Sequence, residues 1–262
     1  MYIDSIILCR DEKEAQAVQT DRLANAGNPS DTSVSDYICS RYDVQKYTSP
    51  VWEGNIVYNE AVYPIKEQDG STTYTLMYTP DAVQSVYDAT FSRLYQEGVD
   101  YTVEGNRLTI LPGSSIAVFD YDYIHPQSNP NNYGWDKYYN RTAAGDGKWE
   151  YWGQSSEFFG GYLNVTYTHS DTWDGYVPEN KAASLPITSR KIESNENMNV
   201  VFFGDSITGG ANSSSYRNLY PYAQYWNEQI ISKLEETYGC TNISDYYSSV
   251  GGSSASGMVS EV

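Results

Sequence analysis

A serine flanked by glycines follows a short apolar run in the last quarter of the chain. The run 199–203 leads into Gly-Asp-Ser, and Gly209 and Gly210 come shortly after Ser206. A serine hydroxyl attacks carbonyls once a base takes its proton, and backbone N–H groups then stabilise the oxyanion that forms. Glycines leave such N–H groups open to a ligand. This pattern favours acyl transfer with Ser206 as the nucleophile.

The residues after Ser206 predict the elements that hold it. Residues 220–239 form a helical pattern, with Pro221 near the first turn and Gly239 just past the end. One face of this helix is apolar and consists of Ala223, Trp226, Ile230, Ile231 and Leu234. A second strand is expected at 243–250. Together these segments predict a β-α-β unit.

Parallel strands of such a unit carry their functional groups at their carboxyl ends. The second strand runs directly into Gly251 and Gly252. Because neighbouring parallel strands end at the same edge of the sheet, we expect the Gly252 N–H to face the Ser206 hydroxyl.

Other motifs do not fit this segment. Residues 204–210 contain no lysine, so they are not a phosphate-binding P-loop, and the dinucleotide pattern GxGxxG is absent. The spacing is GxSxxG and not the GxSxG of α/β-hydrolases. The remaining structural alternative is a Ser-Gly loop that only connects strand to helix.

The sequence "VVFFGDSITGG" resembles the first block of the SGNH, or GDSL-type, hydrolases, and "SSVGGSSASG" at 248–257 resembles their second block. The resemblance implies that Ser206 is the catalytic nucleophile and that the N–H groups of Ser206 and Gly252 form two arms of the oxyanion hole. It implies no metal and no cofactor. Asp205 is expected to shape the turn and not to take part in the chemistry.

Two later blocks of that family, GxND and DxxH, have no counterpart in this sequence. They supply a third oxyanion-hole arm and the catalytic His and Asp. The two histidines present, His125 and His169, precede Ser206 and lie in the β-rich part. We assign neither a catalytic role. We expect the chain to be an incomplete copy of a longer hydrolase and to hydrolyse esters weakly or not at all by itself.

Residues from about 45 to 180 alternate as β-strands do. The clearest cases are the hairpin "DYTVEGNRLTIL", which turns at Gly105-Asn106, and the half-buried strand "YLNVTYTH" at 162–169. The segments "TYTLMY" and "GSSIAVFDYDYI" are further strand candidates. Residues 125–161 are expected to form long loops, and residues 10–27 a weak helix.

The predicted fold class is mixed α and β. We expect an N-terminal β-sandwich or jelly-roll-like leader domain at 1–185, a linker or crossing strand at 186–198, and the first β-α-β part of a flavodoxin-like SGNH hydrolase domain at 199–262. The β-rich part resembles the leader domain of some bacterial SGNH members that look like carbohydrate esterases. This resemblance implies a small-molecule or glycan ester substrate, with an acetyl group as the acyl group, and an extracellular or cell-surface protein.

Composition narrows the choice of partners. The 262 residues carry a formal net charge of −18, which argues against binding to nucleic acid or to anionic membranes. No apolar run has the length of a membrane span, and the N-terminus has no basic region typical of a signal peptide. Cys9, Cys39 and Cys240 show no zinc-site spacing, although Cys9 and Cys39 could pair. The oligomeric state is not predicted.

An alternative function comes from an unusual number of aromatic residues in one stretch: Trp135, Tyr138, Tyr139, Trp149, Tyr151, Trp152 and Trp173. Flat rings stack on the apolar faces of sugars, so a carbohydrate-binding or adhesion module with an inert hydrolase remnant is the second hypothesis. The same rings could instead fill a core or an interface.

Overall fold

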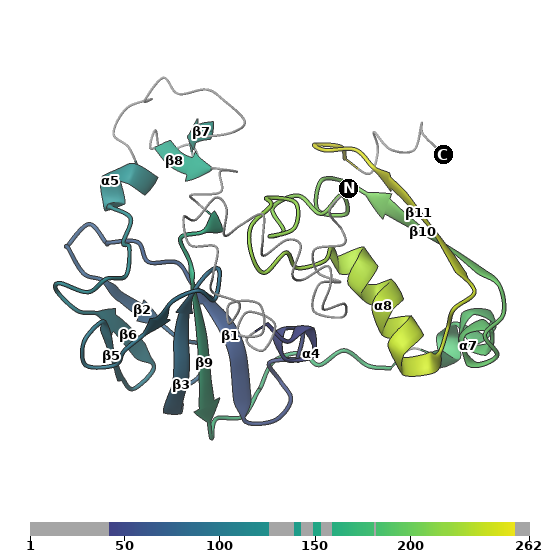
Figure 1. Ribbon diagram of the computed structural model, residues 1–262, viewed down its shortest axis with the longest axis horizontal. Helices are drawn as coiled ribbons and strands as arrows, with labels where there is room; N and C mark the ends of the chain where they lie inside the picture. Colours follow the sequence, from purple (N-terminus) through teal and green to yellow (C-terminus); the bar gives the residue numbers. More distant parts are fainter. Residues whose placement is uncertain (1–41, 126–138, 143–148, 153–158, 181, 255–262) are drawn as a thin grey trace, which may run out of the picture. The chain divides into compact units, whose positions relative to one another are not determined.

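A computed structural model describes residues 42–125, 139–142, 149–152, 159–180 and 182–254 (Figure 1). The described residues form two compact units. The N-terminal unit contains the residues up to Asp174 together with Arg217–Pro221, and the C-terminal unit contains Gly175–Tyr216 and the residues from Tyr222 onward. The fold is mixed α and β with mostly antiparallel sheets, which confirms the coarse fold class.

Two antiparallel sheets form the core of the N-terminal unit (Figure 1). The four-stranded sheet has the order β1 (Ile56–Val62), β9 (Leu163–His169), β3 (Pro80–Asp88) and β4 (Leu94–Tyr95). The three-stranded sheet has the order β2 (Thr73–Thr75), β6 (Arg107–Ile110) and β5 (Tyr101–Glu104). The predicted hairpin is confirmed, because β5 pairs antiparallel with β6 across a turn in which Gly105 has a φ of 57°.

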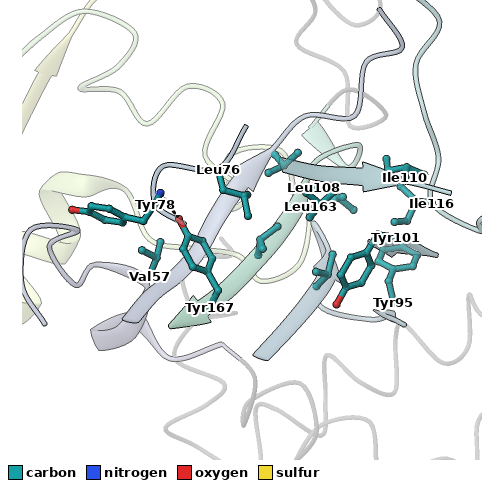
Figure 2. Close-up of a cluster of buried hydrophobic side chains, with 13 residues drawn as sticks. Val57, Leu76, Tyr78, Tyr95, Tyr101, Leu108, Ile110, Ile116, Leu163 and Tyr167 are labelled. Atoms are coloured by element: carbon teal, nitrogen blue, oxygen red, sulfur yellow. Dashed lines mark hydrogen bonds between the residues drawn. The ribbon is translucent and has the colours of Figure 1, made fainter. Parts of the chain in front are cut away.

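Both sheets contribute to one hydrophobic cluster, which Figure 2 shows. The four-stranded sheet supplies Val57, Val62, Val86, Tyr95, Leu163, Val165 and Tyr167, and the three-stranded sheet supplies Tyr101, Leu108 and Ile110. Leu76, Tyr78 and Ile116 come from the connections. Burial of these side chains is the main driving force that holds the unit together.

Strand β9 is more deeply buried than its alternating sequence predicts. It pairs with β1 on one side and β3 on the other, so it lies inside the sheet. Its polar residues Asn164 and Thr166 are buried as well as its apolar ones. Asn164 Nδ2 donates a 2.9 Å hydrogen bond to the carbonyl of Asp88, and Thr166 Oγ1 accepts one of 3.1 Å from the Asn59 N–H. The expectation of a half-buried strand was therefore wrong.

The connection from one sheet to the other is fixed by side chains. "TYTLMY" forms a strand only at Thr73–Thr75, and the chain then bends. Glu60 accepts a 2.9 Å hydrogen bond from the Met77 N–H, and Asp171 accepts one of 2.7 Å from the Thr79 N–H. Between them, the Tyr78 N–H donates to the Tyr167 hydroxyl, as the dashed line in Figure 2 marks. These three bonds satisfy backbone groups that leave the strand ladder.

Two further expectations about loops and strands were wrong. "GSSIAVFDYDYI" contains no strand: apart from an isolated bridge between Phe119 and Ile65, it is irregular until the short helix α5 (Tyr121–Ile124). The 125–161 segment, expected as loops, contains the antiparallel pair β7 (Tyr139–Thr142) and β8 (Trp149–Trp152). The expected helix at 10–27 and the cysteines Cys9 and Cys39 lie outside the described residues.

Short helices occur near the start of the described residues and after the N-terminal unit. Helix α4 (Val44–Tyr47) begins after Asp43, whose carboxylate accepts hydrogen bonds from the N–H groups of Gln45 and Lys46 in the first turn. The segment expected as a linker or crossing strand contains helix α7 (Pro186–Glu193), preceded by the 3₁₀ turn η1 (Ala182–Ser184). Pro186 stands at the first helical position, where its missing N–H costs nothing.

The C-terminal unit is built on the expected β-α-β arrangement. Strands β10 (Met198–Gly204) and β11 (Ile243–Ser249) are parallel and pair from Met198–Ile243 to Gly204–Ser249. Helix α8 (Trp226–Tyr238) connects them and packs on the pair through Trp226, whose ring meets that of Phe202 edge-on with centroids 5.5 Å apart.

The ends of α8 follow local rules. Gly239 ends the helix in the left-handed conformation with a φ of 67°, as its position predicts. At the start, Glu228 accepts a 3.0 Å hydrogen bond from the Tyr225 N–H. Pro221 lies before the helix and not in its first turn, so that detail of the prediction was wrong. Among the described residues, no helix has the length and apolarity to cross a membrane.

Candidate active site

Ser206 lies two residues beyond the end of β10, on the first turn of the β10–α8 connection. Its side chain is half-buried. The turn is closed by backbone hydrogen bonds from Gly209 to Asp205 (3.0 Å), from Gly210 to Ile207 (3.0 Å) and from Ala211 to Ser206 (2.9 Å). The serine therefore sits at the start of a compact, hydrogen-bonded turn at the carboxyl end of a parallel strand, where ligand sites of such sheets occur.

Asp205 shapes this turn, as the sequence predicts. Its carboxylate Oδ1 accepts a 2.9 Å hydrogen bond from the N–H of Ile207, two residues on. This is the local bond by which aspartate favours turns. The Asp205 carboxylate is thus engaged with its own backbone.

The glycines after β11 lie beside the serine. The strand register continues past its last pair, because the Val250 N–H donates a 3.0 Å bond to the carbonyl of Gly204. A Cβ placed on Gly251 would lie 3.9 Å from the Ser206 Cβ. Gly251 is therefore the direct neighbour of Ser206, and Gly252, the residue assigned from the sequence, comes next with a φ of 76°.

The N–H groups assigned to an oxyanion hole are available. Within the described residues, neither the Ser206 N–H nor the Gly252 N–H donates a hydrogen bond, and the Ser206 hydroxyl has no hydrogen-bonding partner. Both glycines of the β11 loop are exposed. Neither N–H group would have to break an existing hydrogen bond in order to bind a carbonyl oxygen.

The glycines of the Ser206 turn are packed tightly. A Cβ on Gly204 would lie 2.1 Å from the Thr208 Oγ1. A Cβ on Gly210 would lie 2.4 Å from the Tyr225 ring, and one on Gly209 would lie 2.9 Å from the Ser249 Oγ. The turn is therefore pressed against β11 on one side and against the start of α8 on the other, and only glycine fits at these positions without a shift.

Asn227 connects this turn to α8. It is 1% exposed, and its Nδ2 donates a 2.9 Å hydrogen bond to the carbonyl of Thr208. Its Oδ1 accepts a 3.0 Å bond from the Glu228 N–H, a donor of the first helical turn. Burial raises the pKa of the Glu228 carboxyl, the hydrogen bond from the Tyr225 N–H opposes that shift, and the charge of Asp245 adds to it.

The histidines belong to the N-terminal unit. His125 ends α5, and its ring lies against Tyr121. His169 ends β9 and is 3% exposed, with its ring stacked on Tyr78 at a centroid distance of 3.9 Å and its Nδ1 3.0 Å from the carbonyl of Asp171. Neither lies in the unit that contains Ser206.

No cluster of three or more His, Cys, Asp or Glu side chains suited to a metal ion occurs in the described part of the chain. Comparison of the chain with protein-family models, with curated proteins and with solved structures found no match in any of the three.

Sequence reasoning found the serine and the glycine loop and missed their supports. Thr208 and Asn227 carried no signal in the sequence. A buried asparagine in the first turn of a helix looks like an ordinary capping residue, and only the fold brings it to the carbonyl of Thr208. The place of Gly251, by contrast, follows from counting the parallel register one residue beyond each strand.

Proposed function

We propose that this protein is a serine esterase of the SGNH type that removes acyl groups, with acetyl groups on carbohydrate as the expected substrates. The observation that carries the proposal is the position of Ser206 beside Gly251 at the carboxyl ends of two parallel strands. A nucleophile next to unengaged backbone N–H groups is the minimum arrangement for acyl transfer. The C-terminal unit is then the opening part of a flavodoxin-like domain, and the N-terminal unit is a β-sandwich leader.

The reaction follows from these groups. The Ser206 Oγ attacks the ester carbonyl as a base takes the hydroxyl proton, and the carbonyl oxygen becomes an oxyanion held by the N–H groups of Ser206 and Gly252. Collapse of the tetrahedral intermediate expels the alcohol, which receives the proton from the base. Water then attacks the acyl-serine by the same route and releases the acid.

No histidine is available as a base in the C-terminal unit, because the chain has two histidines and both belong to the N-terminal unit. We propose that the C-terminal unit by itself lacks the catalytic base. A serine without a base is a weak nucleophile. We therefore expect slow reaction of the chain alone.

A fluorophosphonate probe tests the proposal, with intact-mass and peptide analysis to locate the label. We expect Ser206 to be labelled faster than the other serines of the folded chain, and the label to disappear in Ser206→Ala and after unfolding. Equal labelling of many serines, or no labelling, would contradict an esterase site at Ser206. A small acetyl ester should be hydrolysed weakly. Robust turnover that is lost in Ser206→Ala would instead show that the base is present in this chain.

A second function, carbohydrate binding by the N-terminal unit, is supported by one pair of rings. Trp52 and Trp173 lie with centroids 6.4 Å apart and planes tilted by 45°, and Trp173 is partly exposed. Tilted, partly exposed indoles offer faces on which sugars stack. Binding on a glycan array that is lost in Trp173→Ala, without any labelling of Ser206, would favour this function over the esterase.

A further inference from the structure

We propose that Asn227 is a positioning residue for the nucleophile: its side chain fixes the Ser206 turn to helix α8 and so holds the serine hydroxyl and N–H in their reactive orientation. This inference rests on the proposed function for its catalytic meaning. Its structural part, the fixing of the turn, stands on the contacts of Asn227 alone.

A buried hydrogen bond joins Asn227 to the Ser206 turn. Asn227 Nδ2 donates to the carbonyl of Thr208, and both residues are buried. A hydrogen bond shielded from water is costly to leave unmade, since removal of one partner leaves the other unsatisfied. Thr208 lies two residues after Ser206, inside the turn that the bond from the Ala211 N–H to the Ser206 carbonyl closes.

The side-chain amide of Asn227 is held rigidly. The Asn227 Oδ1 accepts from the Glu228 N–H, so both ends of the side-chain amide are engaged and its rotation is blocked. Asn227 is the second residue of α8, and Tyr225, just before that helix, packs its ring against Gly210 at the other end of the turn. The start of α8 therefore contacts the turn at two points.

The hydrogen bond from Asn227 fixes the position of the Ser206 turn relative to helix α8. The oxyanion of the proposed reaction must lie within about 3 Å of the backbone N–H donors, and small displacements of a catalytic group are costly in rate. Backbone bonds within the turn preserve its shape, but they do not fix its position relative to the rest of the unit. Of the hydrogen bonds made by the described side chains of α8, the one from Asn227 is the bond that reaches the Ser206 turn.

The variants are Asn227→Leu and Asn227→Asp. Leucine has a similar volume and removes both hydrogen bonds of the amide. Aspartate keeps an acceptor for the Glu228 N–H, at a helix start that favours negative charge. It replaces the donor to Thr208 with an oxygen that repels the Thr208 carbonyl oxygen. The matched control is Asn164→Leu, because Asn164 is equally buried and its Nδ2 makes a 2.9 Å bond to a backbone carbonyl in the N-terminal unit.

Amide hydrogen exchange gives the first readout. We expect exchange at the N–H groups of Gly209, Gly210 and Ala211 to rise by about tenfold in both Asn227 variants, as loss of one buried hydrogen bond implies. Exchange along β10 and β11 should change much less, and Asn164→Leu should leave the turn unaffected. A purely structural role would instead raise exchange across the whole unit in proportion to lost stability, and that result would overturn the proposal.

Fluorophosphonate labelling of Ser206 gives the second readout. We expect both Asn227 variants to be labelled about tenfold more slowly than the wild type, with Asn164→Leu labelled at the wild-type rate. Unchanged labelling in Asn227→Asp would overturn the positioning role. If the wild type itself is not labelled, the esterase proposal fails, while faster exchange confined to the turn would still support Asn227 as its anchor.

Discussion

Thr208 occupies the space in which a side chain at Gly204 would lie: a Cβ there would come within 2.1 Å of its Oγ1 and 2.8 Å of its Cβ. The strand β10 therefore ends on glycine because the following turn folds back onto it. The backbone of Gly204 is not in the left-handed region, so the requirement is one of space.

We predict that Gly204→Ala lowers the free energy of unfolding of the C-terminal unit by about 1–3 kcal/mol, the usual cost of overpacking. Thermal or urea unfolding followed by circular dichroism measures it. Thr208→Ala in the same chain should restore part of the loss, because it removes the clashing hydroxyl. A Gly204→Ala protein as stable as the wild type would show that the turn does not pack on the strand in this way.

Gly251 offers a test of the site that leaves stability unchanged. A methyl group at this position would make ordinary contact with the Ser206 Cβ at 3.9 Å, and the backbone needs no positive φ there. We predict that Gly251→Ala unfolds at the wild-type temperature and is labelled by a fluorophosphonate several-fold more slowly, because the methyl group narrows the approach to the hydroxyl.

The control for that experiment is Gly252→Ala. No atom lies within 4 Å of the added methyl group, but the φ of 76° is strained for alanine and costs about 1–2 kcal/mol. We expect this variant to be less stable. The reverse order, with Gly251→Ala the more destabilised of the two, would contradict the arrangement of the β11 loop.

How far the site could be predicted depends on whether local or non-local contacts decide it. Strand β10 follows from a short apolar run that ends in glycine, strand β11 from a short segment before the Gly251-Gly252 pair, and their parallel pairing from the helix between them. Strand β9 was misjudged because its alternation suggests one wet face, whereas its two neighbours come from far along the chain. The segment "GSSIAVFDYDYI" was expected as a strand, whereas Ile116 and Val118 reach the core from an irregular loop.

Because of Asp100, the stability of the N-terminal unit decreases at acidic pH. Its carboxylate accepts hydrogen bonds from the backbone N–H groups of Gln96 and Ser115 and from the hydroxyls of Ser115 and Ser114. The backbone bonds from Gln96 and then Ser115 contribute most to lowering its pKa from 3.8 to about 2. Because the folded pKa lies below the unfolded value, this stabilisation is present above pH 3.8 and is lost as the pH falls toward 2.

We therefore predict that Asp100→Asn lowers stability at pH 7 and that its deficit shrinks as the pH falls from about 4 to 2. Urea unfolding of wild type and variant at a series of pH values measures the difference. Asp69→Asn is the control, because Asp69 lies in an exposed turn and accepts one N–H bond, from Ser71. A deficit that is the same at pH 7 and pH 2.5 would show that ionised Asp100 does not stabilise the fold.

The parallel pair leaves one sheet face uncovered in the described structure. Phe202 is 6% exposed and packs under α8, whereas Val201, Phe203 and Tyr246 are 62%, 43% and 56% exposed. Both faces of a parallel sheet are ordinarily covered, so this face is the expected origin of aggregation.

We predict that Phe203→Thr raises the concentration up to which the chain stays monomeric, without lowering its unfolding temperature. Phe202→Thr is the matched control one residue away and should lower that temperature, because it removes a ring that stacks on Tyr247 at 5.5 Å. Light scattering and thermal unfolding on the two variants separate these outcomes. Equal loss of stability in both would mean that the face of Phe203 is covered in solution.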